Sequence, residues 1–178
     1  MKKYLWIIIG VLSLLTAISS LAFAANSANF NVTVSIAASA DITVTGGPVD
    51  FGVKNTNSSA SSTSAIVIKN TGSGSAQTYS LKLTDPSGWT AVTTAPEFDQ
   101  YRLSAAFDSA GTDIMWATTH ALTSASVAAS ATQFAGNQTG AAVAYNVERK
   151  LWLKIETPNG TSSPSQKTIA VTLTTTVD

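Results

Sequence analysis

The sequence predicts an all-β protein, an antiparallel β-sandwich that follows an N-terminal signal peptide. Three observations lead to this prediction. Apolar and polar side chains alternate with a period of two through most of the chain after the first 24 residues. Clusters of Gly, Pro, Asn, Asp and Ser separate these short segments, as turns separate strands. No long segment has the apolar stripe that is typical of an amphipathic helix.

Residues 1–24 have the three parts of an export signal. Two lysines follow the first residue, residues 5–15 are apolar, and an Ala-Phe-Ala sequence ends at Ala24. We expect cleavage after this alanine. The alternative is an uncleaved membrane anchor, because the apolar character continues from residue 4 to 24, close to the roughly 20 residues that span a bilayer. Cleavage leaves residues 25–178 as a single domain that is secreted or held at the cell surface, with no membrane partner.

Composition narrows the classes of partner. The chain has ten Lys and Arg and ten Asp and Glu, so removal of the two signal lysines changes the net charge from 0 to 8 − 10, or −2. No basic run offers the phosphate contacts that nucleic acids need, so no nucleic acid partner is expected. The chain also has no cysteine. An exported domain without disulfides must gain its stability from a hydrophobic core, from association or from bound ions.

Residues 29–44 are predicted to form the first strand, with Ile42 and Val44 continuing its apolar pattern. Two roles are open for it. The strand pairs within its own domain, or it is a donor strand that completes a neighbouring copy of the chain. Residues 37–40, which are small, would then serve as a hinge. The apolar face of the first half of this strand consists of Phe30, Val32, Val34 and Ile36.

Four further strands are predicted, and turn-forming residues bound each of them. The first is a short apolar run, and the other three alternate between apolar and polar side chains. The first ends at Asn70-Thr71-Gly72, where the asparagine can close an Asx-turn and the glycine can adopt a positive φ. The last two are joined by residues 157–164, whose Pro, Asn and Gly predict a hairpin connection. The four predicted strands are 65–68, 79–83, 151–155 and 169–173.

The pattern is less regular in residues 90–145. Residues 117–131 are rich in Ala, Ser and Thr, which predicts either a short helix or a long loop. Residues 58–64, a Ser/Ala/Thr tract, are predicted to be a mobile surface connection.

A succession of short motifs near the start of the domain resembles known exported modules. Val49-Asp50-Phe51-Gly52 is followed by a strand, the Asn-Thr-Gly turn and another strand, which resembles bacterial Ig-like modules of the ASH type and subunits of TasA/camelysin-like biofilm fibres. The run from Phe30 to Gly52 is also similar to spore-coat-protein-U and other fimbrial-type domains, whose cysteines this chain lacks. These resemblances imply an Ig-like or jelly-roll-like sandwich. They also imply an extracellular structural or adhesive part that sometimes polymerises through an N-terminal donor strand.

Catalytic residues are not evident, and we predict that the chain is not an enzyme. Without cysteine a Cys-His pair is impossible, and a Ser-His-Asp triad would depend on His120, with no Gly-x-Ser-x-Gly motif nearby. This histidine is expected at the surface or half-buried. A glycosidase pair would need two carboxylates held across a cleft, and four scattered acidic residues do not define one. These residues are Glu97, Asp99, Asp108 and Asp113.

Asp108 and Asp113 flank a glycine and suggest a calcium site, because hard cations prefer oxygen-rich loops. Their spacing does not match an EF-hand, and a solvated turn is the alternative. No other cofactor is expected.

Three tryptophans suggest a carbohydrate-binding platform, because flat aromatic faces stack on sugar rings. Core packing is the alternative, and it is expected for Trp89 and Trp116. Trp152 alternates with Lys150 and Lys154, so it belongs to the polar face of its strand. We expect this ring to be covered by a loop or exposed at an interface.

Two classes of function remain. The favoured one is a secreted structural or adhesive subunit of an extracellular fibre, pilus-like filament or surface coat, which binds copies of itself through strand-mediated association. Few charges and many Ser, Thr and Ala residues suit closely apposed neighbours. The alternative is a β-sandwich module that binds carbohydrate or another surface, with a polysaccharide as partner. The residues predicted to mediate self-association are Phe30, Val32, Val34, Ile36 and Trp152.

Overall fold

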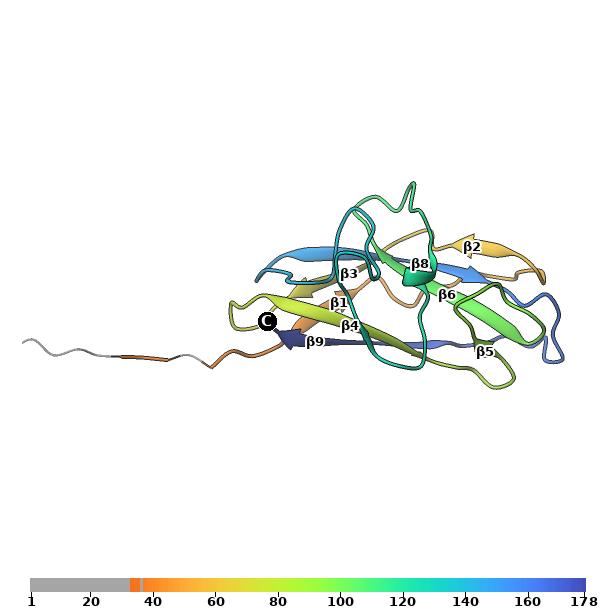
Figure 1. Cartoon of the computed structure of the whole chain (residues 1–178), viewed down its shortest axis with the longest axis horizontal. Coiled ribbons are helices and arrows are strands. Elements are labelled where there is room, and N and C mark those ends of the chain that lie inside the picture. The colour runs from red at the N-terminus through yellow and green to blue at the C-terminus, as the bar shows by residue number, and fades with distance from the viewer. Residues whose placement is uncertain (1–32, 36) are drawn as a thin grey trace, which may run out of the picture. The chain divides into compact units, whose positions relative to one another are not determined.

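The computed structural model describes residues 33–35 and 37–178, and residues 36–178 form one compact unit. This unit confirms the predicted all-β fold, because two sheets face each other in a sandwich-like arrangement (Figure 1). The predicted signal peptide, residues 1–24, lies outside the described residues. No helix within the described residues is long and apolar enough to cross a bilayer.

The larger sheet has six strands in the described part of the chain. Its pairs are antiparallel, except that β5 and β6 are parallel. β2 pairs with β8 beside the main path. The order along the main path is β1 (Ile42–Thr45), β3 (Ile66–Asn70), β8 (Glu148–Glu156), β6 (Gln100–Phe107) and β5 (Thr90–Ala91), and β2 is Ser59–Ser61.

The smaller sheet has three antiparallel strands, in the order β7 (Val127–Ala128), β4 (Gln77–Thr84) and β9 (Ala170–Val177). β4 pairs along its whole length with β9, in a register that places Gln77 opposite Val177 and Thr84 opposite Ala170. β9 is therefore an edge strand of this sheet.

The core lies between the two sheets, on the faces that the sequence predicts. Tyr79, Leu81 and Leu83 of β4 are 0–1% exposed, while Lys82 and Thr84 face outward. The other sheet contributes the buried side chains Leu151, Leu153 and Ile155 of β8. Alternation with a period of two therefore placed both faces correctly.

β6 is a strand that the sequence pattern does not predict. Ser104, Ala105 and Ala106 are all buried, so this part of the strand has no exposed face and no alternation. Its outer side is covered by the following loops, in which Ala121 and Ala135 form isolated bridges with Ser104 and Phe107. A strand buried on both sides by small residues has no periodic signal.

Two predicted connections are wrong. Residues 157–164 do not close a hairpin, because β8 belongs to the larger sheet whereas β9 pairs with β4 in the smaller one. Residues 58–64 are not a free surface connection, since they contain β2 and the buried Ser62, whose hydroxyl accepts a hydrogen bond from the amide of Leu153. Of the two structures predicted for 117–131, the loop is the better description, with a short 3₁₀ turn, η1 (Thr118–His120), and β7.

The Asx-turn predicted at Asn70 is present. The amide of Gly72 donates to the Asn70 side-chain oxygen at 3.0 Å. The predicted positive φ at Gly72 is wrong, and it occurs at Gly74 instead. Gly72 is required by close approach, because a Cβ there would lie 2.3 Å from the carbonyl oxygen of Ser39.

The strand predicted over residues 29–44 begins only at Ile42 in the described part of the chain. Residues 33–35 and 37–41 form no strand. Phe30, Val32 and Ile36 lie outside the described residues.

Candidate functional site

The long edge of the smaller sheet is the feature of the described structure that best fits association. β9 has eight residues and pairs only with β4 in the described part of the chain. The strands at the other sheet edges are shorter: β1 has four residues, and β5 and β7 have two each.

Hydrogen bonds show which main-chain groups of β9 face the open edge. The amide of Asp178 donates to the carbonyl of Ala76 at 3.1 Å, which continues the ladder with β4. Residues of an antiparallel ladder alternately bond to the partner strand and face away from it. Alternate amides of β4 do face away from β9, since Gln77 and Tyr79 donate to Val143 and Gly140. The β9 residues whose N–H and C=O groups point to the open edge are therefore Val171, Leu173, Thr175 and Val177.

The side chains of these four β9 residues point toward the core but are only partly buried. Their partners on the inner face of β4, including Tyr79, Leu81 and Leu83, are almost completely buried. Burial thus decreases from the centre of the sheet to its edge, where Val171 and Leu173 remain partly accessible. A further strand beside β9 would cover these apolar side chains and bond its free main-chain groups.

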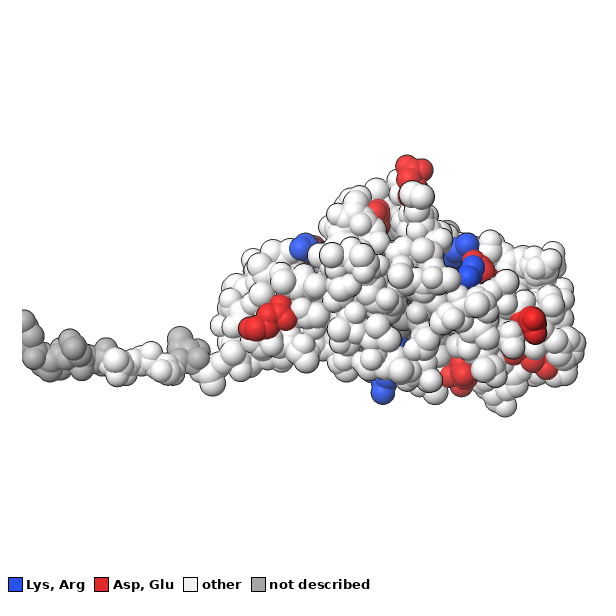
Figure 2. Space-filling view, in the orientation of Figure 1, with Lys and Arg blue, Asp and Glu red and all other residues white. Residues whose placement is uncertain are grey.

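The edge lacks the residues that usually prevent strand addition. Residues 168–177 contain no charged residue, proline or glycine. Proteins commonly protect an edge with lysine, proline, a bulge or a very short strand. On the face seen in Figure 2, charged side chains are few and scattered, with no large region of one sign.

The N-terminal segment joins the sandwich beside the end of β9. Ser73 donates its amide to the carbonyl of Ser39 at 3.1 Å, and Thr71 donates to that of Asp41 at 3.0 Å. The side-chain amide of the buried Gln77 can bond both the N–H and the C=O of Asp41. Because Gln77 also faces Val177 across the ladder, residues 39–41 and the end of β9 lie at one end of the sandwich, which we call the entry end.

The predicted association residues differ in their surroundings. Val34 is 81% exposed. Trp152 is half-buried, and its indole N–H donates to the carbonyl of Asp108 at 2.9 Å. Gly111 lies against the ring so closely that a Cβ there would be 2.2 Å from it. The covering loop, one of the two environments expected for Trp152, is therefore present.

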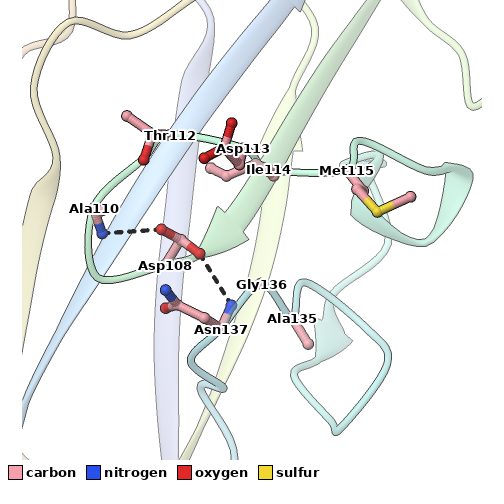
Figure 3. A pocket seen from close by; sticks show the side chains of 9 residues that line it. All are labelled: Asp108, Ala110, Thr112, Asp113, Ile114, Met115, Ala135, Gly136 and Asn137. Atoms are coloured by element: carbon pink, nitrogen blue, oxygen red, sulfur yellow. Dashed lines mark hydrogen bonds between the residues drawn. The ribbon is translucent and has the colours of Figure 1, made fainter.

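Asp108 and Asp113, the predicted calcium ligands, line one open pocket of about 480 Å³ (Figure 3). The Asp108 carboxylate is directed at main-chain amides: one oxygen accepts from Ala110 and Gly111 at 2.9 and 2.8 Å, and the other from Asn137 at 3.0 Å. Asp113 is exposed. Among the described residues, no three His, Cys, Asp or Glu side chains gather where they could hold a metal. Main-chain amides therefore already occupy both oxygens of the Asp108 carboxylate, and no cation site is proposed there.

Three carboxyl groups have lowered pKa values, and hydrogen bonds from the side chains of Ser162 and Thr161 lower that of Asp99. Burial raises the pKa of Asp108, but the amides of Asn137, Ala110 and Gly111 outweigh it and hold the pKa below its usual range. Burial likewise raises the pKa of Glu156, and hydrogen bonds from Arg102 at 2.5 Å and Lys154 at 2.8 Å lower it overall.

These lowered pKa values predict acid sensitivity. A carboxyl whose folded pKa is depressed stabilises the fold fully above its unfolded pKa, and this contribution is lost as the pH falls through the folded value. We expect the free energy of unfolding, measured with urea, to fall between about pH 5 and pH 3. Asp108→Asn should make this decrease smaller. An equal decrease in the variant would show that Asp108 does not contribute.

His120 and the other two candidate tryptophans are buried or partly covered. His120 is 5% exposed, which corrects the expected surface or half-buried position. Its Nδ1 accepts from the amide of Ala117, so Nε2 donates to the carbonyl of Ala135. Trp89 is partly buried against the core, and Trp116 packs edge-on against His120. The three predicted platform rings are therefore all partly covered.

Comparison with known proteins gives no family for this chain. No protein-family model matches it, and no curated protein matches it. The resemblance to exported Ig-like modules therefore stays a prediction from the sequence.

Proposed function

We propose that this chain is a secreted structural or adhesive subunit that binds copies of itself by adding a strand to the open edge of β9. The observation that carries the proposal is this eight-residue edge, which has no partner among the described residues and no protective charge. Export is part of the proposal and is supported by the signal-like residues 1–24.

The chemistry of the edge suits a peptide strand. It offers main-chain donors and acceptors from alternate residues together with the partly covered apolar side chains Val171 and Leu173. In strand addition the main-chain hydrogen bonds provide affinity, and alternate side chains provide specificity. Many such additions from copy to copy build an extended assembly, such as a fibre or coat.

A lysine at the edge tests this function. In Thr175→Lys the new charge points inward from an edge strand, which is a natural defence against strand addition. We expect the concentration required for assembly to rise at least tenfold, or about 1.4 kcal/mol. Assembly would be measured by light scattering and by negative-stain electron microscopy.

Thr174→Lys is the matched control. Thr174 is exposed on the outer face of the sheet, and its main-chain groups face β4, so the same charge should leave the edge free. Thermal unfolding of both variants would show that they are folded. If Thr175→Lys assembles as readily as Thr174→Lys, or if the unmodified protein stays monomeric at high concentration, the proposed function is wrong.

A further inference from the structure

The strand that fills the β9 edge can be identified from the chain itself. We infer that residues 29–36 of a second copy pair with β9 in the antiparallel direction. This inference rests on the proposed function, because it names the occupant of the same edge.

The pattern and length of this segment match the edge. Residues 29–36 and β9 are both eight residues long, and neither contains a charged residue or a proline. The segment has four apolar side chains at every second position, and β9 has four inward side chains at the same spacing. A strand paired in register would therefore place Phe30, Val32, Val34 and Ile36 over the incompletely covered flank of the core.

The described part of the segment has no strand structure of its own. Residues 33–35 form no strand, and Val34 is 81% exposed. Water thus surrounds an apolar side chain that the pattern assigns to a buried face.

The direction of pairing follows from the entry end. β9 runs toward this end, and the N-terminal segment also reaches it, at Ser39. If the segment folded back onto its own β9, both would run toward the entry end, and the pairing would be parallel.

A neighbouring copy reverses this relation. Consider a second copy that has the same orientation and lies beyond the entry end of the first. The segment of the first copy then meets the second copy at the end opposite to the second copy's own entry end. The segment and the β9 of that copy then run in opposite directions. Antiparallel ladders are slightly more stable per residue than parallel ones, and head-to-tail contact repeated in this way gives an open filament.

The short connection also limits the spacing of the copies. Only residues 37 and 38 separate the segment from Ser39, the first of the described residues that is hydrogen-bonded to the sandwich. Two extended residues span about 7 Å. The copies must therefore lie end to end in direct contact.

Deletion of residues 25–36 tests the occupant. We expect the shortened chain to remain folded, to need at least a tenfold higher concentration for assembly, and to show a higher melting temperature when the peptide NFNVTVSI is added. If it is unfolded and the peptide has no effect, the segment is a strand of its own domain, and the inference is wrong.

Cross-linking tests the direction in the full-length exported chain. Because the chain has no cysteine, single cysteines report single contacts. Antiparallel pairing predicts disulfides when Asn31→Cys is mixed with Thr176→Cys, and when Ser35→Cys is mixed with Thr172→Cys, because paired strands bring Cα atoms within disulfide range. The exchanged mixtures, Asn31→Cys with Thr172→Cys and Ser35→Cys with Thr176→Cys, are the matched controls. Preferential disulfides in these controls would overturn the antiparallel direction.

The two proposals fail in different ways. If Thr175→Lys prevents assembly but the deletion does not, the edge is the site and another strand fills it, such as a second β9. The proposed function then stands and this inference falls. If neither change affects assembly, both are wrong.

Discussion

Replacement of Phe107 by alanine is expected to lower the free energy of unfolding by about 3 to 5 kcal/mol. The side chain is 0% exposed at the end of β6, and its ring lies 6.0 Å from that of Tyr79. Gly140 approaches it so closely that a Cβ there would be 2.4 Å from the ring. A tightly enclosed site of this kind cannot collapse around the smaller side chain, so a cavity remains. Urea denaturation would measure the loss.

Phe98→Ala provides the same substitution at the surface. Phe98 is 60% exposed, so its truncation should change stability by only about 0.5 kcal/mol. Equal losses for the two variants would contradict the core that is described for the sandwich. A small loss at Phe107 would show that the loops over β6 can close the cavity.

Asp108→Ala is expected to cost about 2 to 4 kcal/mol, because three main-chain amides lose a charged acceptor. Asp108 is 4% exposed, and the loop that it closes carries Gly111 across the ring of Trp152. Opening of this loop should also expose the ring. Urea denaturation would measure the cost, and acrylamide quenching of tryptophan fluorescence would detect the exposure.

The Asp108→Asn variant distinguishes the contribution of the hydrogen-bond acceptor from that of the negative charge. Asparagine keeps one oxygen that can accept from Ala110 and Gly111, while its NH₂ group cannot accept from Asn137. We therefore expect about half of the loss seen with alanine. If both variants are as stable as the unmodified chain, the hydrogen bonds of Asp108 do not hold the loop.

For the candidate site, the sequence indicated two of the segments involved but not where they lie in the fold. The uncharged run 168–177 and the alternation in 29–36 are both visible without a structure. That β9 lies at a sheet edge is not visible, because it depends on pairing with β4, about 90 residues earlier in the chain. The loop over Trp152 also joins distant residues, so the sequence left two environments open for this side chain.

The all-β class, the inner faces of β4, β8 and β9, and the Asx-turn at Asn70 could be predicted from the sequence, because alternation and turn chemistry are local properties of the chain. Three features become visible only in the folded domain: β8 and β9 belong to different sheets, β6 is buried on both sides, and His120 and Asp108 are enclosed. These outcomes depend on which distant segments pack together. Pairing of strands far apart in the chain leaves no periodic trace in either segment, so packing over the whole domain selects it.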